Sequence, residues 1–144
     1  MTTWLIIIIS ALSLWIGYLQ YLLSKQRSQL DLYDKRYPVF LTTMQYLSFI
    51  AIGRNITNEE LSKFLRNSKD KEFLFGKDVQ QFLDELYKKG VDFLRYKNIL
   101  NDHNLPMERR EKLVDEEAAL FEWFLKQFDE SRSIFKKYLA IDKK

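Results

Sequence analysis

The 144-residue chain contains no cysteine and one histidine, and its formal net charge is +3. The missing cysteines exclude a disulfide framework and thiolate chemistry, and the small net charge gives no reason to expect a nucleic acid duplex as partner. The chain has only four glycines and two prolines, so it is poor in the turn residues that strand-rich folds require. We therefore predict an all-α protein, with an N-terminal transmembrane helix followed by a cytosolic helical bundle of about four helices.

Residues 1–24 form the predicted transmembrane anchor helix. The run from Trp4 to Leu23 carries no charge, and it has about the 20 apolar residues that a helix needs to cross the hydrocarbon core of a bilayer. Aromatic rings near both ends and cations after the run are typical of the membrane–water interface. The predicted membrane-interface residues are Trp4, Tyr18, Tyr21, Lys25, Arg27, Lys35 and Arg36.

The same run has two other interpretations, a cleaved signal peptide and a buried core helix. A signal peptide has a basic residue before its apolar run and a small-residue cleavage site after it, and the sequence shows neither. The basic residues Lys25, Arg27, Lys35 and Arg36 all follow the run. The positive-inside rule then predicts a single-pass protein with its N-terminus outside and residues 25–144 in the cytoplasm.

Residues 25–56 form a predicted juxtamembrane helix, which contains the segment LDLYDKRYPVF from Leu30 to Phe40. Asp31 and Lys35 have the favourable order for an exposed ion pair on a helix. Pro38 removes one backbone donor and crowds the preceding turn, so we expect a kink or a break there. Residues 37–53 carry no charge and are long enough for a short second span, but their polar residues favour a buried central helix or one at the membrane interface.

Residues 57–144 form the predicted cytosolic bundle. Thr57 and Glu60 match a capping box that begins a helix ending near Arg66. A second helix begins near Lys77, and glycine in its middle is unfavourable unless another helix packs closely there. The turn 101–106 precedes a final helix. The apolar stripe of the Lys77 helix comprises Val79, Phe82, Leu83, Leu86, Tyr87, Gly90, Phe93 and Leu94.

Residues suited to catalysis or metal binding are scarce. His103 stands alone in a polar turn, whereas zinc needs three or four convergent ligands. No glycine-rich phosphate loop and no nucleophilic serine motif occurs. We expect no enzyme activity, no cofactor and no metal.

Seven residues are candidate contacts for a protein partner or a small anionic ligand. Lysine and arginine side chains can bind phosphates, and a tryptophan at the edge of an apolar stripe can anchor an interface. The alternative is that these cations are ordinary solvated side chains of helix surfaces. The candidates are Lys88, Lys89, Arg95, Lys97, Trp123, Lys136 and Lys137.

Two motifs carry a resemblance to a known group of proteins. The first is the juxtamembrane box LDLYDKRY, from Leu30 to Tyr37, and the second is a C-terminal pattern made by Trp123, Phe124, Phe135, Tyr138 and Leu139. Together with the N-terminal span, they resemble small single-span bacterial inner-membrane proteins. The resemblance implies a bacterial inner-membrane location and a structural role for the motif residues, and it implies no reaction.

The sequence leaves two hypotheses about function open. The first is a membrane-anchored helical scaffold or protein-interaction module that forms a homo-oligomer or belongs to a membrane complex. The second is a ligand-gated membrane effector, for example a nucleotide-sensing oligomer that permeabilises the membrane in antiviral defence against phage.

Overall fold

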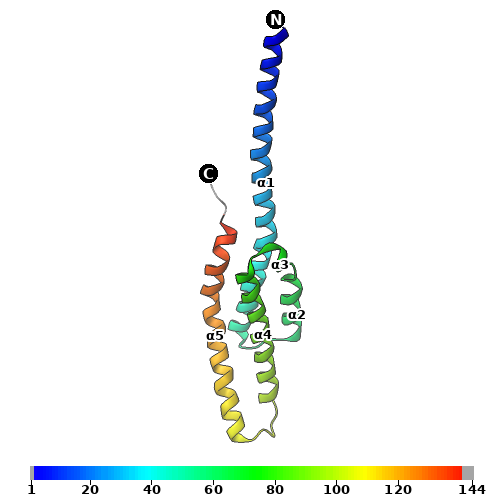
Figure 1. The fold of residues 1–144 in the computed structure, drawn as a ribbon. Coiled ribbons are helices and arrows are strands. Elements are labelled where there is room, and N and C mark those ends of the chain that lie inside the picture. The colour runs from blue at the N-terminus through cyan, green and yellow to red at the C-terminus, as the bar shows by residue number, and fades with distance from the viewer. Residues whose placement is uncertain (1, 141–144) are drawn as a thin grey trace. The chain divides into compact units, whose positions relative to one another are not determined.

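The computed structural model describes residues 2–140, and these residues form an all-α protein (Figure 1). Four long helices and a single helical turn follow each other along the chain. The long helices are α1 (Thr2–Gly53), α2 (Asn58–Asn67), α4 (Lys77–Leu100) and α5 (Met107–Leu139), and the helical turn is α3 (Lys71–Leu74). The predicted all-α class is confirmed.

The contacts within the chain divide it into two units inside helix α1. In the first, residues 2–34, almost every side chain is exposed, including Trp4 (73% exposed) and Trp15 (64%). This helix is long and apolar enough to cross a membrane, judged by length and composition. The second unit, residues 35–140, contains the hydrophobic core. It begins inside the predicted juxtamembrane segment.

Residues 35–53 of α1 line the core of this second unit. Val39, Thr43, Tyr46, Leu47 and Ile50 recur at helical spacing, and all five are buried. The Tyr46 ring stacks on Phe64 of α2 at 4.3 Å between ring centres, and it meets Phe124 of α5 edge-on at 6.4 Å. Burial of this face explains the apolar character of residues 37–53 without a second membrane span.

Helix α1 continues through Pro38 without ending. The sequence predicts a kink or a break at this position, and the break does not occur. Proline costs one hydrogen bond to the preceding turn, but Val39 and Thr43 on its C-terminal side are buried in the bundle. Core packing therefore holds the helical conformation across the proline, and a kink there stays a prediction.

The start of α2 and the middle of α4 follow the sequence closely. Thr57 caps α2, because its hydroxyl oxygen accepts a hydrogen bond from the Glu60 backbone N–H at 3.2 Å. Gly90 in α4 is buried, and a Cβ atom built there falls well inside van der Waals distance of the Tyr46 hydroxyl. The close helix packing that the sequence requires at this glycine is therefore present.

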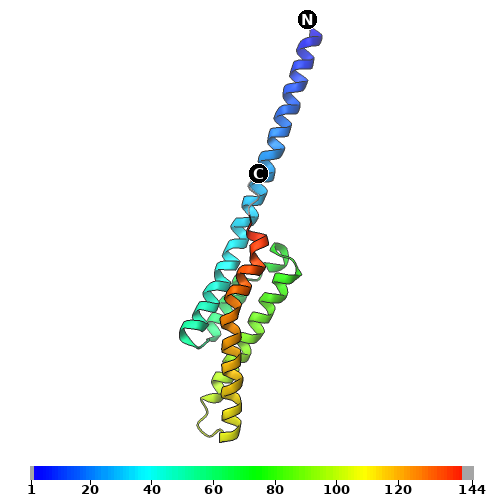
Figure 2. The ribbon, with the colours of Figure 1, turned by 90° about the vertical axis from the view of Figure 1, so that its left-hand side faces the viewer.

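Helices α4 and α5 run antiparallel, side by side (Figure 2). Their connected ends extend beyond the ends of α1 and α2 in both views (Figures 1 and 2). Phe93 of α4 packs edge-on against Phe124 of α5 at 5.8 Å between ring centres. The bundle thus has a packed body and a projecting α4–α5 hairpin.

Candidate interaction site

The two motifs of the sequence meet around the side chain of Arg36. Its Nε donates a hydrogen bond to the Leu74 carbonyl at 2.8 Å, and its Nη1 donates one to the Tyr138 carbonyl at 3.3 Å. The guanidinium also lies over the Tyr138 ring, 5.3 Å from its centre. A half-buried arginine of α1 therefore closes the end of α5, at the carbonyl groups that a helix leaves unpaired.

Aromatic rings around Phe135 of the C-terminal pattern form the apolar side of this cluster. Phe135 packs edge-on against Phe40 at 5.4 Å and against Phe75 at 5.2 Å between ring centres. Phe75 precedes α4, Phe40 belongs to α1 and Phe135 to α5. Phe135 thus joins three segments of the bundle.

Tyr138 links the end of α5 to the start of α4. Its hydroxyl accepts a hydrogen bond from the Gly76 backbone N–H at 3.0 Å and donates one to Asp78 Oδ1 at 2.7 Å. Lys137 forms an ion pair with the same carboxylate. The hydrogen bonds from Lys137 and then Tyr138 lower the pKa of Asp78 to about 2. Asp78 is therefore a constant anion at neutral pH.

A second charged cluster lies around Glu117 of α5, which is only 4% exposed. Arg54 donates two hydrogen bonds to its carboxylate, at 3.3 and 3.0 Å, and Lys97 Nζ lies 3.0 Å from Oε1. Burial raises the pKa of Glu117, but the hydrogen bonds from Arg54 and Lys97 outweigh burial, so the pKa is lower than usual. Two cations thus hold a buried carboxylate in its charged form.

Arg54 reaches Glu117 from an unusual backbone conformation. Its φ angle is 43°, in the left-handed region that commonly ends a helix. The guanidinium also lies 4.8 Å from the centre of the Phe121 ring, in a cation–π contact. The end of α1 is therefore tied to α5 by charge and by aromatic packing.

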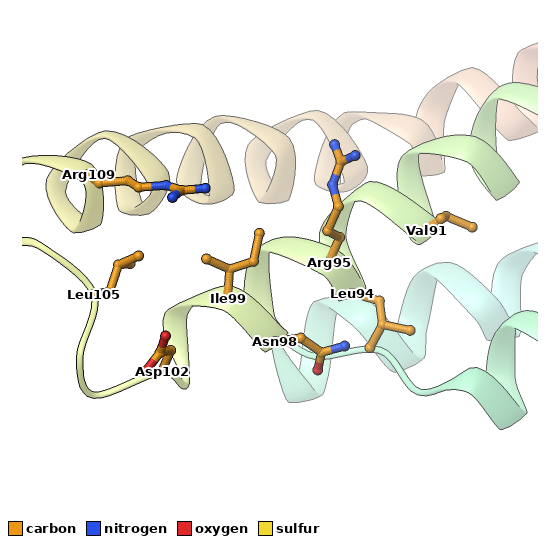
Figure 3. A pocket seen from close by; sticks show the side chains of 8 residues that line it. All are labelled: Val91, Leu94, Arg95, Asn98, Ile99, Asp102, Leu105 and Arg109. Carbon is orange, nitrogen blue, oxygen red and sulfur yellow. The ribbon is translucent and has the colours of Figure 1, made fainter.

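A shallow hollow of about 590 Å³ surrounds the projecting end of α4 (Figure 3). Ile99 of α4 faces Leu105 and the Arg109 side chain of α5, and Arg95 extends beside them (Figure 3). Val91 and Met107 of this hairpin are 42% and 72% exposed. The hollow is lined by Val91, Leu94, Arg95, Asn98, Ile99, Asp102, Leu105 and Arg109. It offers apolar surface beside two guanidinium groups.

The predicted partner or ligand contacts do not converge on one site. Lys89 lies 5.7 Å from the centre of the half-buried Trp123 ring, and Arg95 pairs with Asp92 at 3.1 Å. Lys97 pairs with Glu117, and Lys137 pairs with Asp78. Lys88 and Lys136 are exposed. Only Arg95 of the seven lines the hollow on the hairpin.

The predicted membrane-interface residues divide between the two units. Trp4, Tyr18, Tyr21, Lys25 and Arg27 are exposed on α1 in the first unit. Lys35 is exposed at the start of the second unit. Arg36 instead lies against Leu74 and Tyr138 within the bundle.

Four residues of these clusters are not among those predicted from the sequence: Glu117, Arg54, Asp78 and Arg109. For Glu117 a signal existed, because it occupies the helical stripe that Leu113, Leu120 and Phe124 define. A single acid within an apolar stripe indicates a buried, paired carboxylate. The other three residues carry no comparable local signal.

Within residues 2–140, no group of His, Cys, Asp and Glu side chains is placed to hold a metal ion. Comparison with known proteins found no matching family model, no similar curated protein and no similar solved structure. The resemblance to single-span bacterial proteins stays a prediction from the two motifs.

Proposed function

We propose that this chain is a membrane-anchored helical module that binds another protein and has no catalytic activity. The observation that carries the proposal is the exposure of the charge-free run Trp4–Leu23, in a chain that has a separate, well-packed core. Exposed apolar surface on this scale is costly in water and favourable in a bilayer. The bundle is then held at a membrane surface.

The proposed location is the bacterial inner membrane, with one span, the N-terminus outside and the bundle in the cytoplasm. The basic residues Lys25, Arg27 and Lys35 after the run support this orientation through the positive-inside rule. A reporter enzyme fused after residue 144 is expected to be active only in the cytoplasm, and activity on the outer side would refute the orientation.

The membrane anchor is tested with an arginine at the centre of the run. Leu12→Arg is expected to move the full-length chain from the membrane fraction to the carbonate-extractable fraction, because a central arginine costs about 2.5–3.5 kcal/mol of insertion free energy. Thr3→Arg, before the run, is the matched control and stays in the membrane. If carbonate extracts the unmodified chain, the anchor proposal fails.

The hollow on the α4–α5 hairpin is the proposed docking site for the protein partner. Its apolar lining residues, Val91, Leu94, Ile99 and Leu105, suit an apolar segment. The Arg109 guanidinium suits an acidic side chain on that segment, whereas Arg95 pairs with Asp92. The site lies on the α4–α5 hairpin, whose connected end extends beyond the C-terminal end of α1 (Figure 1). We therefore propose a partner whose docking segment is apolar and acidic.

Site-specific photo-crosslinking in membranes tests this docking site. A photoreactive residue at Val91 is expected to give a discrete adduct, and Arg109→Glu is expected to remove it by charge repulsion. Leu65 of α2, 46% exposed against 42% for Val91, is the matched control position. Equal adducts at both positions, or an adduct that survives Arg109→Glu, would refute the docking site.

The ligand-gated effector remains the alternative hypothesis. It needs several cations gathered around one anionic ligand. Lys97 and Lys137 already neutralise Glu117 and Asp78, Arg95 pairs with Asp92, and Lys89 lies over the Trp123 ring. These contacts favour the interaction module.

A further inference from the structure

The serines, the glycine and the glutamine of the apolar run share one face of α1. Ser10, Ser13, Gly17 and Gln20 follow each other at intervals of three and four residues. At about 3.6 residues per turn, these positions occupy an arc of roughly 100° on the helix surface. The remaining surface of the run is formed mainly by large apolar and aromatic side chains.

This face is the part of the run that a bilayer accommodates least well. The Ser10 and Ser13 hydroxyls donate to the backbone carbonyls of Ile6 and Ile9, each at 2.8 Å. The Gln20 amide forms no hydrogen bond within residues 2–140. In membranes, polar and small side chains favour contact with another helix, where amides bond across the interface and small residues allow close approach.

The same face continues beyond the run and carries both signs of charge. Ser24, Arg27 and Asp31 follow Gln20 at the same spacing. A hollow of about 470 Å³ lies here, lined by Gln20, Leu23, Ser24, Arg27, Ser28 and Asp31. Arg27 and Asp31 form no ion pair with each other within residues 2–140.

The order of these charges makes the face complementary to itself. When two copies lie parallel about a two-fold axis, each residue comes level with its own counterpart. Arg27 of one copy then reaches Asp31 of the other diagonally, about one helical turn further along, and the reverse contact forms by symmetry. An anionic lipid would suit Arg27 but would be repelled by Asp31. The charge pattern therefore indicates a second copy of this chain as the occupant.

We propose that α1 pairs in parallel with α1 of a second copy through this face, from Ser10 to Asp31. Ser10, Gly17, Ser24 and Asp31 recur at intervals of seven, which matches a left-handed crossing of two helices. The two Gln20 amides bond to each other across the axis and set the register, and two Arg27–Asp31 pairs close the inner end. The inference rests on the membrane anchor of the proposed function.

The absence of cysteine allows a direct test on the full-length chain. Gly17→Cys and Ser24→Cys place a thiol on the proposed face, and Trp15→Cys and Leu22→Cys place one on the opposite side. After oxidation in membranes, the first two variants are expected to form disulfide-linked dimers several-fold more than the second two. Equal crosslinking of all four variants would overturn the inference.

Substitutions in the Ser24→Cys background test the chemistry of the face. Gln20→Leu is expected to reduce the crosslinked dimer several-fold, whereas Leu19→Ala, off the face, leaves it unchanged. Arg27→Asp is expected to weaken the dimer, and adding Asp31→Arg restores it by reversing both charges. If neither Gln20→Leu nor the charge reversal changes the amount of crosslinked dimer, the proposed register is refuted.

A carbonate wash of the same membranes separates the two possible failures. If the chain is lost in the wash, the anchor fails and the pairing inference fails with it. If the chain is retained and the variants crosslink without preference for this face, the pairing inference alone fails.

Discussion

Helix α1 contains two regions that differ in the exposure of their apolar side chains. In residues 2–34 large apolar side chains are exposed, as Trp15 is at 64%. In residues 35–53 the apolar stripe is buried, and Leu47 and Ile50 are fully inaccessible. One continuous helix therefore belongs to two environments. The difference shows that helix formation and burial are decided separately, the first by local sequence and the second by what surrounds the helix.

The largest expected difference between the regions concerns aromatic side chains. Phe93→Ala removes a ring that is 0% exposed and contacts Phe121 and Phe124, so it should lower the free energy of unfolding of the bundle by about 3–5 kcal/mol. Trp15→Ala should leave it unchanged. Urea unfolding of the full-length chain in detergent measures both values, and equal losses would contradict the division into two units.

The next largest effect is expected at the buried carboxylate. Glu117→Gln keeps the size of the side chain but leaves Arg54 and Lys97 without their anion, and it should cost about 2 kcal/mol, since both cations retain access to water. Glu122→Gln, at an exposed position of α5, is the matched control, with an expected change below about 0.5 kcal/mol.

Lowering the pH should reduce the stability that the Glu117 carboxylate contributes. The folded chain lowers the pKa of Glu117 below the ordinary value of 4.5 and that of Asp78 from 3.8 to about 2. The folded state therefore binds protons less readily than the unfolded state, and the stability that these groups contribute is complete above about pH 5 and is lost as the pH falls toward 2. Across this pH range, the free energy of unfolding should change less steeply with pH in Glu117→Gln than in the unmodified chain. An unchanged slope would contradict the ion-pair cluster.

A glycine-to-alanine substitution in each region tests the effect of adding a single methyl group. Gly90→Ala forces a Cβ atom against the Tyr46 hydroxyl and should destabilise the bundle by about 1–3 kcal/mol, despite the better helix propensity of alanine. Gly17→Ala meets no atom within 4 Å and should leave bundle stability unchanged. Thermal unfolding of the two variants gives the comparison, and a stabilised Gly90→Ala would contradict the close packing of the Tyr46 hydroxyl against Gly90.

Two arginines near the boundary give the smallest expected effect. Arg36→Ala removes the hydrogen bonds to the Leu74 and Tyr138 carbonyls and should cost about 1–2 kcal/mol. It should also speed backbone hydrogen exchange in the last turn of α5. Arg27→Ala should change neither quantity, and faster exchange in that variant would contradict the boundary near residue 35.

The sequence predicted the elements of the fold better than the contacts of the candidate sites. The start of α2 at Thr57 and the apolar stripe of α4 follow from caps and periodicity, which are local. The same local rules predict a kink or a break at Pro38. The helix continues through this residue, and burial of Val39 and Thr43 stabilises the helical conformation on its C-terminal side. Arg36 has the sequence setting of a membrane-interface residue, but it binds the Tyr138 carbonyl, 102 positions away.

The sequence by itself determined that the chain is helical, that it carries a charge-free run long enough for a bilayer, and that Gly90 needs a close neighbour. These properties depend on composition and on spacing within a few turns. Only the tertiary structure decided that Glu117 lies between Arg54 and Lys97 and that Tyr138 bonds to Gly76 and Asp78. Such contacts join residues about 20 to 63 positions apart, and helical periodicity does not encode which faces of distant helices will meet.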